Sequence, residues 1–197
     1  MVDSFQICHF STMKQNELNQ LRLELAVKAK HGLDFIIAAA IIWAVITFVW
    51  TLPYTAYDRS ILTFIVGGVM LPLAFGLSKV LKTTWTVPDN PLQPLGLWLN
   101  FAQLFYFPFL IFILSTHPDY FLMTYVIITG AHFFPYAWFY HEIAYAIMAG
   151  VISVGALIIA MNVGTQSMFW IGLFMVMSLM ILAVWLYFSY QKKLLAP

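Results

Sequence analysis

The sequence predicts an all-α integral membrane protein, a bundle of six transmembrane helices. Of its 197 residues, 62% are hydrophobic and only 9% are charged. A soluble domain carries roughly a quarter charged residues, so this chain could not cover a surface that faces water. The apolar residues form blocks of about twenty, the length that a helix needs to cross ~30 Å of hydrocarbon. These continuous blocks exclude a β-barrel, whose strands alternate polar and apolar residues.

Residues 1–33 are expected to form a cytoplasmic N-terminal amphipathic segment. Thr12 and Gln15 fit a capping box, and Leu18, Leu21 and Leu25 share one helical stripe. Basic residues surround the stripe, which favours a short helix lying at the inner headgroup layer. A partly ordered tail is the alternative. The single cysteine, Cys8, rules out an internal disulfide.

The transmembrane domain is expected over residues 34–190, followed by a cytoplasmic C-terminal tail over 191–197. The six predicted spans are Asp34–Leu52, Ser60–Ser78, Pro94–Leu114, Asp119–Tyr140, Glu142–Met161 and Ser167–Tyr190. Asp34 is expected to cap the first span, and Pro72 should bend the second. The glycines of the second span, at positions 67, 68 and 76, are expected to let helices approach closely.

The basic residues predict the orientation of these spans. Six spans place both termini on one side of the membrane. With the N-terminus inside, eight of the nine Lys and Arg residues are cytoplasmic, and only Arg59 lies outside. Cytoplasmic loops carry an excess of Lys and Arg, so we expect both termini in the cytoplasm.

Three polar side chains are expected at a common depth in the third and fourth spans. Asn100 and Gln103 lie ~9–14 Å from the cytoplasmic end of one span, and His132 lies ~12 Å from that end of the next. The connection between these spans is short, so the helices should be antiparallel neighbours. A polar group that faces lipid leaves its hydrogen bonds unmade, at roughly 2–7 kcal/mol. The three side chains are therefore expected to point inward and to converge.

Two interpretations of this convergence stay open. The residues are either interhelical hydrogen-bond contacts or a polar pocket that opens to the cytoplasm and binds a small ligand or relays a proton. Tyr106 and Tyr136 are candidate lining residues of that pocket, although lipid contact and core packing are the favoured explanation of these aromatic side chains. Its expected mouth consists of polar residues at the cytoplasmic ends of the spans, namely Asp34, Lys79, Asp89, Asn90, His141 and Glu142.

No pattern for catalysis, metal or cofactor binding is found. His141 and Glu142 lie too far around a helix from His132 for a His-Glu-x-x-His site. No serine–histidine or carboxylate pair is placed by spacing, so enzymatic activity is unsupported. We expect no cofactor and no nucleic-acid partner. The expected partner is the lipid bilayer, and a small-molecule or lipid ligand and self-association stay open.

Two stretches resemble a known family. Asn90-Pro91-Leu92, followed by the run from Leu95 to Pro108, and the run from Ile128 to Tyr136 are similar to a family of small, uncharacterised bacterial multi-pass membrane proteins that carries a domain of unknown function. The resemblance covers nearly the whole chain. It implies a protein of the bacterial inner membrane and supplies no mechanism.

The sequence thus favours a membrane protein that binds or transports a small solute through a polar site around Asn100, Gln103 and His132. One alternative is a non-catalytic membrane scaffold or accessory subunit, whose polar residues serve packing alone. The other is an intramembrane enzyme acting on a lipid-like substrate.

Overall fold

The computed structural model describes residues 2–195, with side chains from residue 14 onwards, and all regular structure in this part is helical. Five helical segments are long and apolar enough to cross a membrane: Lys30–Val49, Ala56–Leu81, Gln93–Thr116, Ile143–Asn162 and Thr165–Leu195. The expected all-α, multi-pass membrane architecture is therefore confirmed.

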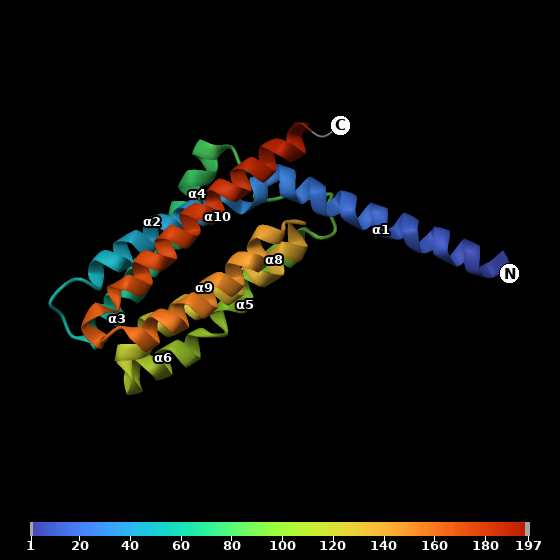
Figure 1. Ribbon diagram of the computed structural model, residues 1–197. Helices are drawn as coiled ribbons and strands as arrows, with labels where there is room; N and C mark the ends of the chain where they lie inside the picture. The colour runs from blue at the N-terminus through green and yellow to red at the C-terminus, as the bar shows by residue number, and fades with distance from the viewer. Residues whose placement is uncertain (1, 196–197) are drawn as a thin grey trace.

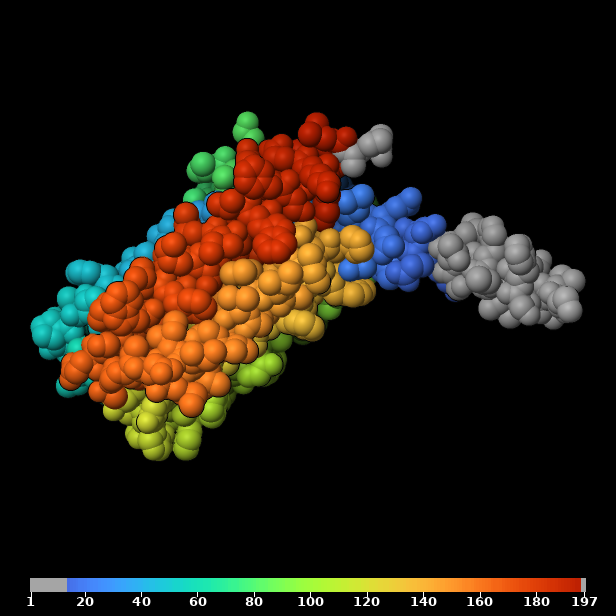
Figure 2. All heavy atoms as spheres, viewed as in Figure 1, coloured from blue at the N-terminus to red at the C-terminus, as the bar shows by residue number. Residues whose placement is uncertain are grey.

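The helices follow one another as α1 Val2–Lys28, α2 Leu33–Val49, α3 Ala56–Gly67, α4 Met70–Leu81, α5 Gln93–Leu104, α6 Phe107–Thr116, α7 Phe121–His132, α8 Phe134–Phe139, α9 Ile143–Asn162 and α10 Phe169–Leu195. Helices α2, α5, α9 and α10 run along one common direction, and α1 projects away from them (Figure 1). Helix α2 packs along α10, and α9 packs along both α7 and α10. Helices α9 and α10 form most of the face seen in Figure 2.

The bundle has two ends, which we name by their connections. The α1 end carries the α1–α2 junction at residues 29–32, the connection 82–92 and the turn 140–142. Helix α1 projects away from the bundle there, and the C-terminus lies at the same end (Figure 1). The opposite end carries the connections 50–55, 117–120 and 163–168.

Prolines divide three of the apolar segments. A proline has no N–H to donate to the carbonyl four residues earlier, and its ring clashes with that carbonyl. The breaks lie two to four residues before Pro72, Pro108 and Pro135. Helix α3 gives way to α4 at 68–69, α5 to α6 at 105–106, and α7 to α8 at 133. The bend expected from Pro72 is thus found.

The fourth predicted span, 119–140, is not among the five long segments. It is divided into a 3-10 turn at Pro118–Tyr120, the 12-residue α7 and the 6-residue α8. Pro135 in the first turn of α8 accounts for the break between α7 and α8. Both α7 and α8 pack against α9, so together they follow its course.

Close helix approach occurs at one of the expected glycines and at two others. A Cβ atom on Gly67 of α3 would lie 3.1 Å from the Tyr125 hydroxyl of α7, as expected. A Cβ atom on Gly172 of α10 would lie 2.6 Å from Thr47 Oγ1 of α2, and one on Gly130 of α7 would lie 2.6 Å from Ile152 Cγ2 of α9. At Gly76 the same atom would meet nothing within 4 Å. The prediction for Gly76 was therefore wrong, because α4 turns that position away from its neighbours.

The N-terminal helix is longer than predicted. It begins at Val2, so Thr12 does not start it, and the side chains of Thr12 and Cys8 lie outside the described residues. Leu25 and Ala26 are buried against the bundle. The placement of α1 at the headgroup layer stays a prediction. At the other terminus, residues 191–195 belong to α10, and the rest of the predicted tail, 196–197, lies outside the described residues.

Candidate functional site

The α1–α2 junction has a backbone conformation that its sequence disfavours. Lys30, His31 and Gly32 have φ values of 46°, 57° and 71°, so three successive residues are left-handed. Only glycine enters this region without a steric cost. Two tyrosines hold the junction: the Tyr145 hydroxyl donates to the His31 carbonyl at 2.5 Å, and a Cβ on Gly32 would lie 3.2 Å from the Tyr140 hydroxyl. Tertiary contacts therefore place His31 where local preference would not.

His31 lies beside a buried carboxylate. The residue is fully buried, and its Nδ1 is 3.9 Å from Oε2 of Glu142, which is 6% exposed. Neither ring nitrogen of His31 has a hydrogen-bond partner. Glu142 is better satisfied, because its Oε2 accepts hydrogen bonds from Ser189 Oγ and, at 3.3 Å, from Lys193 Nζ. The site thus combines a satisfied carboxylate with an unsatisfied imidazole.

The neighbours of Glu142 keep it ionised. Burial would raise the pKa of this carboxyl, but the Ser189 hydrogen bond and the charges of Lys193 and a protonated His31 lower it further than burial raises it. The pKa of Glu142 therefore lies below its ordinary value. Lys193 also donates to the His141 carbonyl at 3.0 Å, which ties the end of α10 to the turn 140–142.

A line of aromatic rings leads from this cluster towards the middle of the bundle. The His31 ring centroid is 6.2 Å from that of Tyr140, which stacks on Tyr145 at 6.0 Å and on Tyr136 at 5.9 Å. Tyr136 in turn meets His132 edge-on at 5.3 Å. The rings therefore connect the histidine of the junction to the histidine of α7.

Asp34 forms a second buried carboxylate site next to the first. It is 1% exposed, and its Oδ2 accepts hydrogen bonds from Thr83 Oγ1 at 2.8 Å and Trp85 Nε1 at 2.6 Å. The expectation that Asp34 caps the first span was wrong, because Gly32 is the N-cap of α2. Asp34 lies in the first turn instead, where the helix dipole favours a negative charge.

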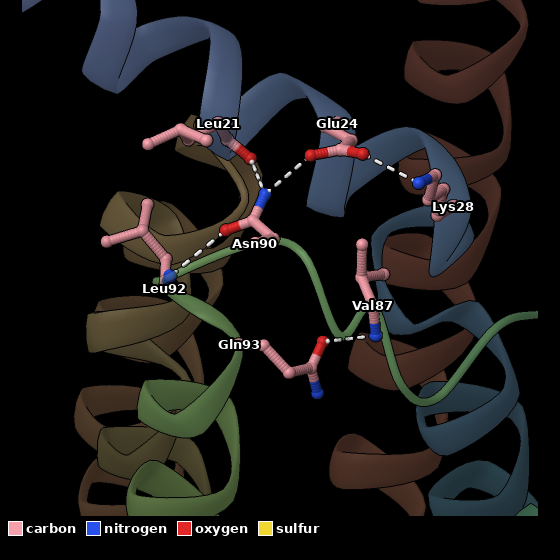
Figure 3. Close-up of polar contacts among 7 residues, drawn as sticks. All are labelled: Leu21, Glu24, Lys28, Val87, Asn90, Leu92 and Gln93. Atoms are coloured by element: carbon pink, nitrogen blue, oxygen red, sulfur yellow. Dashed lines mark hydrogen bonds and ion pairs between the residues drawn. The ribbon is translucent and has the colours of Figure 1, made fainter.

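Asn90 fastens α1 over this end of the bundle (Figure 3). Its Nδ2 donates to the Leu21 carbonyl at 2.9 Å and to Glu24 Oε2 at 2.8 Å, and its Oδ1 accepts from the Leu92 N–H at 3.0 Å. On the far side of α1, Arg22 Nε donates to the Trp138 carbonyl at 2.6 Å. The last turns of α1 are therefore held by connections that flank the site.

The three side chains of the predicted pocket do not all lie where the sequence predicted. Asn100 is exposed on α5, and its Nδ2 donates to the Gly96 carbonyl of its own helix at 2.9 Å. The expectation that Asn100 faces the interior was wrong, since an amide can bond the carbonyl one turn back. Gln103 is half-buried and Tyr106 is exposed. His132 is half-buried and contacts Tyr136. The approach of Gln103 to His132 stays a prediction.

The residues of the predicted mouth divide into two groups. Asp34, Asn90 and Glu142 are buried and hydrogen-bonded at the α1 end, whereas Lys79, Asp89 and His141 are exposed. Four residues of the site were not predicted from the sequence, namely His31, Ser189, Lys193 and Tyr145. The available signal for His31 was its position directly before a glycine, between a charged segment and the first apolar block.

The comparisons with known proteins give a family and no activity. Among the residues that the structure describes, no three His, Cys, Asp or Glu side chains gather in a way that could hold a metal ion. Neither the curated proteins nor the solved structures contain a match to the chain. A family model described as a family of unknown function, DUF7010, matches residues 18–189. The chain therefore belongs to the DUF7010 family, whose model spans the chain from the last turns of α1 to residue 189 of α10.

Proposed function

We propose that this protein binds and passes a small solute in the membrane, and that the solute at the α1 end is a proton carried by His31 and Glu142. The observation that carries the proposal is the buried imidazole, whose two ring nitrogens have no hydrogen-bond partner 3.9 Å from a carboxylate. An unsatisfied buried polar group costs about 1–3 kcal/mol, so its presence calls for an explanation, and proton exchange supplies one.

The chemistry of the pair suits proton exchange. A neutral imidazole accepts a proton at one nitrogen and can release one from the other. Glu142 would stabilise the imidazolium that forms, as opposite charges at this distance do in a buried site. Tyr140 and Tyr136 continue the line of ring contacts from His31 to His132. Histidines within membrane spans are typical of proton pathways in membrane proteins.

We place the α1 end at the cytoplasmic face of a bacterial inner membrane. Eight of the nine basic residues lie in elements of that end, which supports an N-in, C-in orientation. Because α7 and α8 both pack along α9, residues 121–139 would supply the sixth crossing that this orientation requires. The pair would then exchange protons with the cytoplasm.

Proton flux into proteoliposomes tests the proposal. Full-length protein is reconstituted with a trapped pH-sensitive dye, and a potassium diffusion potential drives the flux. We expect flux above that of empty liposomes, and at least a tenfold loss in His31→Gln and Glu142→Gln. His117→Gln is the matched control, because His117 is exposed at the opposite end. The proposal would be refuted if the wild-type flux equals that of empty liposomes, or if folded His31→Gln carries the same flux as the wild type.

An accessory subunit is the second candidate function, and the third apolar segment favours it. In this segment, Gln93–Thr116, only 6% of the most apolar stretch is buried within the chain, and the polar side chain of Asn100 is exposed. Exposed amides in a span commonly hydrogen-bond to another helix. Co-purification with a second membrane protein, lost in Asn100→Leu, would support this role. A protein that runs as a monomer irrespective of that substitution would count against it.

A further inference from the structure

The opposite end of the bundle holds a pocket that plays no part in the proposed proton site. Three connections meet around a cavity of about 420 Å³, a size within the usual range of small-ligand sites. Its polar lining comes from all three connections and the start of α3: Tyr54, Thr55, Arg59, Asp119, Thr165 and Gln166.

Arg59 is a buried cation without an anionic partner. It is 8% exposed, it lines the pocket, and its Nε is buried without a hydrogen-bond partner. Among the residues that the structure describes, no carboxylate lies within 4.0 Å of its guanidinium, whose nearest aromatic contact is the Trp50 ring at 5.9 Å. A buried guanidinium is costly unless an anion and its oxygen acceptors offset the lost hydration. The pocket beside it is where such an anion would lie.

Asp119 supplies the opposite charge on the rim of the same pocket. It is exposed and lies in the turn between α6 and α7. Among the residues that the structure describes, its carboxylate has no hydrogen-bond or ion-pair partner. A pocket with one cation and one anion complements a ligand that carries both charges. Thr165 and Gln166 add neutral donors and acceptors to the lining of the pocket.

We propose that this pocket binds a zwitterionic group, with a phosphate or carboxylate on Arg59 and an ammonium on Asp119. Arg suits the first role because its planar fork of N–H donors matches both anions. Two sources share this chemistry, a dissolved amino acid or amino phosphate and the headgroup of an ethanolamine phospholipid. The site lies at the end of the bundle remote from His31 and Glu142, so either proposal can fail without the other.

Titration of the full-length protein with soluble probes tests the pocket. Phosphoethanolamine and glycine present both charges, and inorganic phosphate presents only the anion. We expect saturable binding of a zwitterionic probe by calorimetry in detergent, weakened at least tenfold in Arg59→Met. Asp119→Asn, at an exposed position, should abolish the preference for phosphoethanolamine over inorganic phosphate. Lys79→Met removes an exposed cation at the α1 end and should bind as the wild type does.

Native mass spectrometry separates the two sources. Retained ethanolamine phospholipid that is lost in Arg59→Met, without affinity for the soluble probes, would identify the lipid headgroup. Affinity for a soluble zwitterion would identify a dissolved ligand. If Arg59→Met does not fold, binding of the soluble probes and of ethanolamine phospholipid is compared between the wild type and the variants Arg59→Lys and Asp119→Asn. The proposal is overturned if neither probes nor ethanolamine lipid bind, or if binding is equal in folded Arg59 and Asp119 variants.

Discussion

The fastening of α1 by Asn90 makes a quantitative prediction. Asn90 is 2% exposed, and its side chain makes three hydrogen bonds. Two of them reach α1, one at the Leu21 carbonyl and one at the Glu24 carboxylate. A neutral hydrogen bond contributes about 0.5–1.5 kcal/mol net and one to a charged group about 1.5–3. The Glu24 side chain is 37% exposed, so solvent screening reduces its share. We therefore expect Asn90→Ala to weaken the docking of α1 by about 2–4 kcal/mol.

Limited proteolysis measures this loss. Arg22 is 7% exposed and donates to the Trp138 carbonyl, so trypsin can cut after it only when α1 has left the bundle. The cleavage rate follows the population of that open state when closing is fast. A loss of 2–4 kcal/mol should raise the cleavage rate by roughly 30-fold to several hundred-fold. The matched control is Asp89→Ala, because Asp89 is exposed and makes no recorded hydrogen bond with a described residue. Cleavage of Asn90→Ala at the wild-type rate, with the bundle intact, would refute this reasoning.

Three further predictions follow from the packing and the charges. Gly172→Val should destabilise the bundle by about 1–3 kcal/mol, measured as a lowered melting temperature in detergent, because its side chain would overlap Thr47. The pKa of Glu142 is lower in the folded state than in the unfolded state, where it is ~4.5, so the ionised carboxylate stabilises the fold above that pH. This stabilisation should be lost as the pH falls through the folded pKa, and Glu142→Gln should lose that acid dependence. Asp34→Leu should shift the near-ultraviolet circular dichroism of Trp85, whose Nε1 loses its acceptor; an unchanged spectrum would contradict the hydrogen bond.

The architecture was largely predictable from composition and prolines. Apolar blocks of about twenty residues identified five long segments, because hydrocarbon admits little else as a crossing element. The position of the bend before Pro72 followed from the missing N–H. The divided segment between residues 118 and 139 shows the limit of this reasoning, since one proline turned a predicted continuous helix into shorter pieces.

The candidate site was only partly predictable. Asp34, Asn90 and Glu142 were identified by their position at the ends of apolar blocks, and all three are buried and hydrogen-bonded. The inward placement of Asn100 failed because a side-chain amide can bond its own helix, which no periodicity reveals. His31 was missed because its burial depends on contacts with residues more than a hundred positions away, such as Tyr145.

The central claim is that His31 and Glu142 act as one proton-exchanging unit, and a double-mutant cycle of proton flux tests it most directly. Groups that act together are strongly non-additive, so removing the second costs little once the first is gone. We predict that the double variant His31→Gln/Glu142→Gln loses no more flux than either single variant. Independent losses that multiply in the double variant, with all four proteins folded, would contradict the account.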